Sequence, residues 1–332
     1  MKSQFALLFS LFCSLSFGQS REDYVTVKRT LKLMGTRFEI TVVAQTEEIG
    51  YINIDLAVSE ITRIEKIISS WDKESETSLI NANAGIKPVK VSPELFQLIE
   101  RAIKISEITD GAFDITYASM DNIWRFDGSM DKMPSESEIK NSVSKIGFQK
   151  IILNGDEQTV YLPETGMRIG FGAIGKGYAA DRAKSLLISK GVPGGIINAS
   201  GDLTTWGTKA TGEKWLVGIA NPLSKDKVFS WLPVVESSVA TSGNYEKYLI
   251  LNDKKYSHII DPRTGYPTTG ISSVSIFANQ AELCDALATA VFIMGKDVGL
   301  HMINQIDGVE AVIVDEKNKI HKSSGIMLDS NP

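Results

Sequence analysis

The stretch YVTVKRTLKL-MGT-RFEITVVA, residues 24–44, indicates how the fold begins. Residues 24–33 and 37–44 have the composition of strands, and the short Met34-Gly35-Thr36 turn between them predicts a hairpin. Residues 50–70 follow with apolar side chains at the spacing of one helix face. The positions concerned are Ile54, Ala57, Val58, Ile61, Ile64 and Ile68.

Alternating strands and helices continue to the end of the chain. Ser92 followed by Pro93 predicts the start of a helix that ends near Thr109, and Asn154-Gly155 predicts a hairpin turn within 149–162. Further helices are expected from Ser135 and over 177–190, 280–294 and 297–306. Further strands are expected near 194–199, 214–219, 228–235, 247–251 and 272–277, with a final pair around 315–319. Residues 71–83 are polar with no clean period. Since strands outnumber helices and hairpins are common, the predicted class is α+β with mixed, largely antiparallel sheets and packed helices.

Residues 1–18 have the pattern of an export signal. Lys2 precedes an apolar run over 5–12, and Ser16 and Gly18 stand at −3 and −1 of a cleavage point. The run is too short for a membrane span, which needs about 20 residues. A lipid anchor on Cys13 is disfavoured because bulky Phe12 precedes it. We therefore expect a periplasmic protein whose residues 19–332 form one domain; association with the inner-membrane face stays open.

The composition excludes several other classes of protein. The 332-residue chain carries a formal charge of −5 and has no block of Lys or Arg, which argues against nucleic acid as a partner. No segment after residue 20 is long and apolar enough to span a membrane. Cys284 is the only cysteine after the signal, so no internal disulfide is expected.

The glycine-rich segment from Gly170 to Gly177 allows three interpretations. It matches G-x-G-x-x-G and opens a predicted helix, as in dinucleotide-binding folds. Such folds place an acidic residue about 20 positions further on, whereas the nearest candidate, Asp202, lies 27 residues beyond Gly175. The glycines could instead form a tight turn, or the backbone N–H groups and Lys176 could face a phosphate.

Asp285 and Thr289 are four residues apart, so they lie on one side of their predicted helix. A carboxylate among apolar neighbours is costly unless it is paired or binds a metal. A carboxylate, a hydroxyl and a nearby carbonyl would suit Mg²⁺ better than Zn²⁺. The alternative is a structural Asp285 that forms a salt bridge or caps a loop.

Three further positions could carry chemistry or serve the structure alone. His258 ends a predicted strand just before an Asp-Pro-Arg-Thr-Gly turn. Trp71 lies in a polar loop, where it could stack on a planar ring or pin the loop to the core. Residues 109–114 pair two carboxylates, Asp110 and Asp114, around a turn.

Eight segments in this order resemble the ApbE family of FAD:protein FMN transferases. They are MGTRFEI (34–40), SSWDKESETSLIN (69–81), TDGAFDIT (109–116), GAIGKGYAADRA (172–183), INASGDL (197–203), SVATSGNYEKY (238–248), HIIDPRTGYPT (258–268) and DALATAVFIMG (285–295). The resemblance covers nearly the whole chain after the signal and implies an ApbE-like fold.

The resemblance also implies roles for individual residues. Mg²⁺ would be held by Asp285, Thr289 and the main-chain carbonyl of Ala173, and His258 would be the general base. The flavin site would be formed by Met34, Trp71, Ala112, Phe113, Asp114, Lys176 and Ile259. The sequence departs from the family pattern at Gly170, where Asp is common, and at Cys284, where Ala is usual.

The implied reaction transfers FMN from FAD, the substrate, to a Thr or Ser hydroxyl of an acceptor protein and releases AMP. Family acceptors carry an Asp-x-x-[Ser/Thr]-Gly-Ala-[Ser/Thr] motif (DxxSGAT-like) and include subunits of Nqr- and Rnf-type respiratory complexes. The alternatives are an FAD pyrophosphatase, a non-catalytic periplasmic flavin-binding protein and a Rossmann oxidoreductase. An aromatic residue at position 71 resembles the transferase type.

Overall fold

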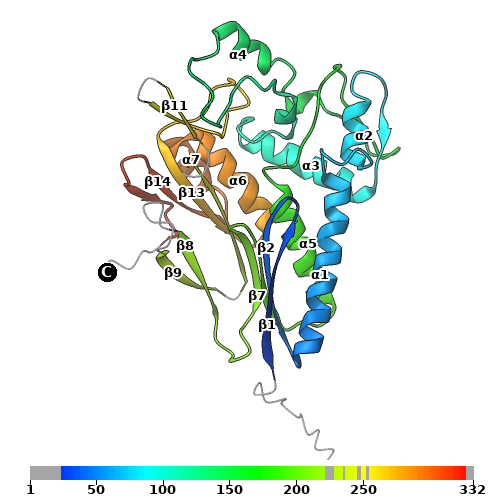
Figure 1. Cartoon of the computed structure of the whole chain (residues 1–332), viewed down its shortest axis with the longest axis vertical. Coiled ribbons are helices and arrows are strands. Elements are labelled where there is room, and N and C mark those ends of the chain that lie inside the picture. The colour runs from blue at the N-terminus through cyan, green and yellow to red at the C-terminus, as the bar shows by residue number, and fades with distance from the viewer. Residues whose placement is uncertain (1–23, 221–227, 235, 245–247, 252–253, 327–332) are drawn as a thin grey trace, which may run out of the picture.

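The centre of the molecule is an eight-stranded sheet (Figure 1). The computed structural model describes residues 24–220, 228–234, 236–244, 248–251 and 254–326. The strand order is β1 (Val25–Leu33), β2 (Thr36–Ala44), β6 (Gly194–Ala199), β7 (Asp202–Gly207), β10 (Ser237–Gly243), β13 (Ile271–Ala278), β14 (Glu310–Asp315) and β15 (Ile320–Lys322). Every neighbouring pair in this sheet is antiparallel. The structure confirms the α+β class.

Four helices in the described part of the chain pack against strands of this sheet. In the order of the chain they are α1 (Glu47–Ile68), α5 (Gly175–Ser189), α6 (Ala281–Met294) and α7 (Lys296–Ile303). Helix α1 packs on β1 and β2, α5 on β6 and β7, and α6 on β10 and β13. Helix α5 also packs against both α1 and α6, so it lies between them (Figure 1). The apolar stripe predicted for α1 is buried except at the half-buried Val58.

Smaller elements surround this core. Between α1 and α5 the chain forms the helices α2 (Glu76–Ala82), α3 (Pro93–Ile108) and α4 (Glu136–Ser142) and the 3₁₀ helices η2 (Ile115–Ser119) and η3 (Phe148–Lys150). The same part of the chain forms a small sheet with the strand order β3 (Val89–Lys90), β5 (Thr159–Tyr161) and β4 (Ile152–Asn154). Two hairpins complete the fold: β8 (Trp215–Ala220) with β9 (Val228–Val234), and β11 (Tyr248–Leu251) with β12 (Lys254–Ser257). Among the described residues, no helix combines the length and apolarity needed to cross a membrane.

Several local predictions are confirmed and others are wrong. Ser92 and Ser135 cap α3 and α4 as expected. Residues 71–83 contain α2, which was not predicted; Ser75 caps it by accepting a hydrogen bond from the backbone N–H of Ser78. Strands β7, β10 and β12 were also missed. In β7 and β10 buried hydroxyl groups pair with each other, for example Ser238 with Thr204 at 2.9 Å, so their polar residues do not mark an exposed loop.

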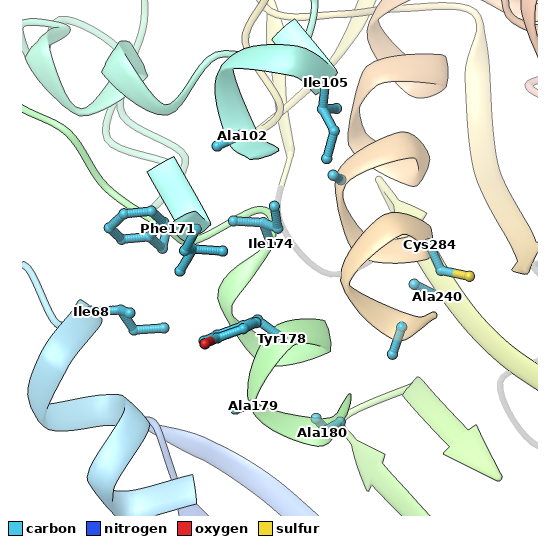
Figure 2. Packing of buried hydrophobic residues seen from close by; sticks show 14 of the residues in the cluster. Ile68, Ala102, Ile105, Phe171, Ile174, Tyr178, Ala179, Ala180, Ala240 and Cys284 are labelled. Carbon is cyan, nitrogen blue, oxygen red and sulfur yellow. The ribbon is translucent and has the colours of Figure 1, made fainter. Parts of the chain in front are cut away.

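Helices α5 and α6 approach each other closely at their first turns. A Cβ atom on Gly177 would lie 2.1 Å from the backbone oxygen of Ala281 and 2.8 Å from the backbone nitrogen of Glu282. Only glycine fits there, because backbone atoms cannot move aside as a flexible side chain can. Buried side chains such as Ile68, Ile105 and Cys284 fill the surrounding space (Figure 2).

Gly177→Ala is therefore expected to lower the free energy of unfolding by about 2–3 kcal/mol, because the added methyl group forces the two helices apart. Urea denaturation would measure the change. Gly155→Ala is the control, because its Cβ would meet no atom within 4 Å and it should change stability by less than about 0.5 kcal/mol. Equal effects of the two substitutions would contradict a special role for the helix contact.

Candidate active site

Two buried carboxylates face one lysine where α5 meets α6. The Lys176 Nζ atom lies 3.0 Å from Asp202 Oδ2, and it lies 3.2 Å and 3.3 Å from the two carboxylate oxygens of Asp285. The side chains of Asp202 and Asp285 are 7% and 6% exposed, and that of Lys176 is 28% exposed. The structure thus brings together two predicted site residues, Lys176 and Asp285, and adds Asp202 to them.

Four elements of the core, β7, β10, α5 and α6, hold these side chains in place. Asp202 is the first residue of β7, and its Oδ1 atom accepts a hydrogen bond from the backbone N–H of Thr241 in β10. Asp285 lies one turn into α6, and its Oδ2 atom accepts from the backbone N–H of Gly177 at 3.2 Å. The glycine at 177 therefore permits the helix contact and also binds the carboxylate.

The charges in this cluster do not balance. Burial, together with the charge of Asp285, raises the pKa of Asp202, and the nearby Lys176 only partly opposes that shift. Burial alone would lower the pKa of Lys176, but the charges of Asp285 and Asp202 raise it above its ordinary value. With all three groups ionised, the cluster carries two negative charges and one positive charge. A second cation would therefore be stabilised here.

The neighbouring groups supply further oxygen atoms. The Thr289 hydroxyl lies 3.3 Å from that of Ser242, and Lys176 Nζ lies 3.5 Å from the carbonyl oxygen of Gly172, the residue before Ala173. The described residues include no group of three or more His, Cys, Asp or Glu side chains able to hold a metal. A metal here would depend on mixed oxygen donors, which is the donor set that Mg²⁺ takes. The chemistry of Asp285, Thr289 and Ala173 fits such an ion.

The glycine-rich turn before α5 rests on η2. The backbone N–H of Gly170 donates to the carbonyl of Ile115 at 2.8 Å, and a Cβ atom on Gly172 would lie 2.5 Å from the Tyr117 hydroxyl oxygen. A Cβ atom on Gly170 would lie 3.1 Å from that of Ala118. These contacts account for small residues at 170 and 172. A dinucleotide fold needs a strand that runs directly into the glycine-rich turn and a parallel sheet. Here β5 ends at Tyr161 and the main sheet is antiparallel, so the dinucleotide-fold interpretation is wrong.

The segment 112–114 lies beside the turn but is largely buried. The side chains of Ala112 and Phe113 belong to the core, so any ligand contact there falls to their main chain. Asp114 accepts hydrogen bonds from the backbone N–H groups of Thr116 (2.7 Å) and Phe148 (2.8 Å), and burial raises its pKa. Asp114 therefore caps η2; its contact with a flavin remains a prediction.

The turn after His258 and Ile259 contacts this region, because Arg263 Nη1 donates to the Asp110 carbonyl at 3.4 Å. Trp124 Nε1 donates to the Gly265 carbonyl at 2.8 Å, and the Ile259 carbonyl accepts from the backbone N–H of Thr268 at 2.9 Å. Ile259 packs against the main core, whereas His258 is exposed at the bend after β12. The histidine is therefore accessible to a group from outside the chain.

Met34 and Trp71 occupy contrasting environments. The Met34 side chain packs against the core, and a Cβ atom on Gly175 would lie 3.8 Å from its terminal methyl group. Trp71 is 93% exposed in the loop after α1. The idea that Trp71 pins this loop to the core is therefore wrong, and its role in stacking on a ring remains a prediction.

Sequence reasoning missed Asp202, Tyr117 and Ser242 as parts of the site. In the sequence Asp202 stands out only through its spacing from Gly175, and Tyr117 follows directly after the TDGAFDIT segment. Ser242 lies in SVATSGNYEKY, which carried the resemblance without a role. The signal for Asp202 and Ser242 would have been a carboxylate on β7 and a hydroxyl on β10, the strands that pack under α5 and α6. Neither β7 nor β10 was predicted.

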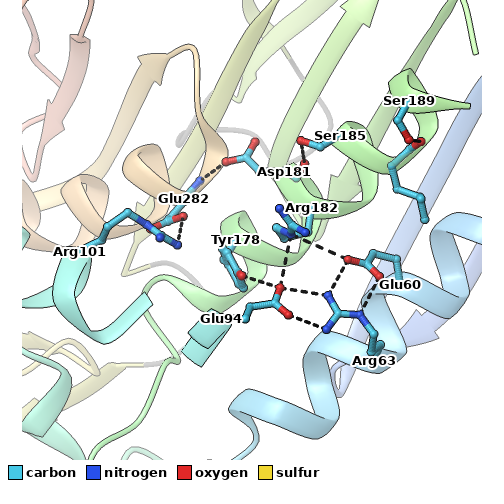
Figure 3. Close-up of polar contacts among 11 residues, drawn as sticks. Glu60, Arg63, Glu94, Arg101, Tyr178, Asp181, Arg182, Ser185, Ser189 and Glu282 are labelled. Atoms are coloured by element: carbon cyan, nitrogen blue, oxygen red, sulfur yellow. Dashed lines mark hydrogen bonds and ion pairs between the residues drawn. The ribbon is translucent and has the colours of Figure 1, made fainter. Parts of the chain in front are cut away.

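The other side of α5 is held by an ion-pair network (Figure 3). Glu94 accepts hydrogen bonds from Arg63 at 2.6 Å and from the Tyr178 hydroxyl at 2.7 Å. Asp181 accepts from the backbone N–H of Glu282 at 2.9 Å, so it caps the start of α6. These contacts connect α5 to α1, α3 and α6 and stabilise the orientation of Lys176 relative to Asp285.

Comparisons with known proteins agree on one family. Residues 34–313 match the model described as the ApbE family. An FAD:protein FMN transferase from Treponema pallidum is 31% identical over 278 residues, which cover 79% of this chain and 77% of that protein. One from Klebsiella pneumoniae is 31% identical over 274 residues, with coverages of 82% and 85%. The crystal structure of the ApbE protein from Thermotoga maritima superposes with a TM-score of 0.81 at 31% identity, covering 91% of this chain and 97% of that one.

Asp181 gives the stability of the folded chain a testable pH dependence. Burial raises the pKa of Asp181 to about 6 from an ordinary value of 3.8. The folded chain thus holds this proton more tightly than the unfolded chain, and the resulting stability is present below pH 4 and lost as pH rises through about 6. The free energy of unfolding of Asp181→Asn is therefore compared with that of the unchanged protein at pH 4.5 and at pH 7.5. The difference should be roughly 1–2 kcal/mol more in favour of the variant at pH 7.5. Urea denaturation at both pH values would test this, with the exposed Asp297→Asn as control; a difference independent of pH would contradict it.

Proposed function

This chain belongs to the ApbE family, and from that premise we propose that it is an enzyme that transfers FMN from FAD to a Ser or Thr hydroxyl of another protein. The transfer forms a phosphoester bond and releases AMP. The observation that carries the proposal is the buried cluster of Lys176, Asp202 and Asp285 at the glycine-rich turn. Two relatives 31% identical to this chain are named FAD:protein FMN transferases, which supports an enzyme of this type.

Charge neutralisation is the first requirement of this reaction. The two phosphates of FAD are negatively charged and repel an attacking oxygen until that charge is offset. Lys176 would donate hydrogen bonds to the phosphates from its position at the turn. Asp285, Thr289 and the Ala173 carbonyl would hold Mg²⁺, which supplies further positive charge to the phosphates and the leaving group when bound.

A proton must also leave the acceptor hydroxyl. His258 is exposed at the bend after β12, where a hydroxyl on another protein would approach its imidazole. An imidazole is suited to accept a proton near neutral pH. The turn after His258 contacts the segment before η2 through Arg263 and the Asp110 carbonyl, which supports the placement of His258 beside the bound FAD.

The flavin ring requires a flat apolar surface. Trp71 presents an exposed indole that would stack on the ring, and Met34 and Ile259 would contribute apolar contacts near the start of α5. Residues 112–114 would contribute main-chain groups. A ring covered by Trp71 would be shielded from water, which favours transfer to a protein hydroxyl over hydrolysis.

We also propose that the enzyme acts after export. The predicted signal, residues 1–18, lies outside the described residues, so this proposal rests on the sequence pattern alone. The acceptors would be periplasmic segments of Nqr- or Rnf-type subunits that carry the Asp-x-x-[Ser/Thr]-Gly-Ala-[Ser/Thr] motif.

The decisive experiment mixes residues 19–332 with FAD, Mg²⁺ and a protein bearing the acceptor motif. The intact mass of the acceptor should rise by one FMN, with equal release of AMP, and EDTA should abolish both. Asp285→Asn should lower the rate at least about 100-fold, whereas the exposed Asp297→Asn should not. AMP and free FMN without a mass gain would indicate a pyrophosphatase, and no AMP at all would leave a flavin-binding protein.

His258 is tested by separating binding from transfer. His258→Ala should slow transfer roughly 100-fold, because the base is lost, while the Kd for FAD measured by fluorescence should change by less than about threefold. His301→Ala, in the exposed part of α7, is the matched control. A large loss of FAD affinity in His258→Ala would show that the histidine binds the ligand and is not the base.

A further inference from the structure

The Lys176 ammonium contacts both of the Asp285 oxygens, and a metal bound to this carboxylate would need at least one of them. It is within 3.3 Å of both Asp285 oxygens and 3.0 Å from Asp202 Oδ2. An ammonium and a divalent cation repel each other, so they cannot share one carboxylate without a cost. Binding of the metal at Asp285 therefore requires Lys176 to give up that contact.

We propose that Lys176 is an internal counter-ion of Asp285 that a divalent metal displaces, and that Asp202 is the positioning residue that retains the ammonium when this happens. The proposal rests on the metal site of the proposed function and adds a role for Asp202. Asp202 would bind no substrate group and would act through Lys176.

The geometry around Asp202 suits this role. Its two oxygens have separate partners, since Oδ1 accepts from the backbone N–H of Thr241 at 3.3 Å and Oδ2 faces Lys176. The strand β10 thus holds the carboxylate in place whether or not Asp285 changes partner. Lys176 can lose its contact with Asp285 without leaving the site, because the contact with Asp202 remains.

The exchange also changes the charge that the ligand meets. With Asp202, Asp285 and Lys176 ionised, the cluster has a net charge of −1 and repels a pyrophosphate. A divalent cation changes the net charge to +1, and Lys176 is then directed by Asp202 rather than bound to Asp285. The cluster thus favours an anionic ligand only after the metal has entered.

The test measures Mn²⁺ affinity by calorimetry in the protein without FAD. Lys176→Gln, which removes the competing charge, should bind Mn²⁺ about tenfold more tightly. Asp202→Asn, which leaves Lys176 with Asp285 alone, should bind about tenfold more weakly. Lys176→Arg keeps the charge and should stay within about threefold of the unchanged protein. Lys184→Gln is the matched control on the same helix; its ammonium contacts Thr204, and its effect should stay within about twofold.

The double variant Lys176→Gln/Asp202→Asn separates the two possible roles of Asp202. If Asp202 acts through Lys176, adding Asp202→Asn to Lys176→Gln should weaken Mn²⁺ binding by less than about threefold. An equal tenfold loss in both backgrounds would overturn the positioning role, because Asp202 would then act on the metal itself. Unchanged or weaker binding by Lys176→Gln would overturn the competition. Thermal unfolding of each variant confirms that it is folded.

Failure of this proposal is distinguishable from failure of the proposed function. A protein that labels the acceptor and binds Mn²⁺, but whose Lys176→Gln variant shows no gain, contradicts only the competition. A protein that shows the expected gain but labels no acceptor contradicts only the transfer. Absence of Mn²⁺ binding by both the unchanged protein and Lys176→Gln would overturn the metal site and this proposal together.

Discussion

The close contact between the first turns of α5 and α6 is the constraint on which the site depends. It exists because Gly177 has no side chain to meet the backbone of Ala281. The contact lets the Gly177 N–H bind Asp285 and sets Lys176 against the same carboxylate. Asp181 and the ion pairs around Glu94 stabilise the same arrangement from the other side of α5 (Figure 3).

The charged groups of the cluster, Lys176, Asp202 and Asp285, affect both the stability of the fold and the ligands that the cluster can bind. Carboxylates as buried as Asp202 and Asp285 are costly unless a cation is near, and the ammonium of Lys176 contacts both of them. With both carboxylates ionised, a further cation would be stabilised beside them. His258 and Trp71, by contrast, are exposed outside this buried centre.

Predictions from the sequence succeeded for elements that are stabilised by interactions between residues close together in the chain. The first hairpin, the apolar stripe of α1 and the serine caps of α3 and α4 follow from neighbouring residues alone. The predictions failed for β7 and β10, whose buried Thr204 and Ser238 bind each other across strands. Because the buried residues are polar, neither strand has the apolar alternation by which a strand is predicted. Their partners are distant in the chain, so the pairing is not visible in the sequence either.

The sequence by itself determined the α+β class, most helices and the ordered segments that identify the family. It also marked Lys176, Asp285 and Thr289, because their spacing and chemistry are local properties. Only the tertiary structure decided that Lys176 lies between two carboxylates, that Asp202 is the second of them, and that the glycine-rich turn is not a dinucleotide fold. The physical reason is that charge balance and close packing depend on which distant segments meet, and a one-dimensional pattern does not contain those contacts.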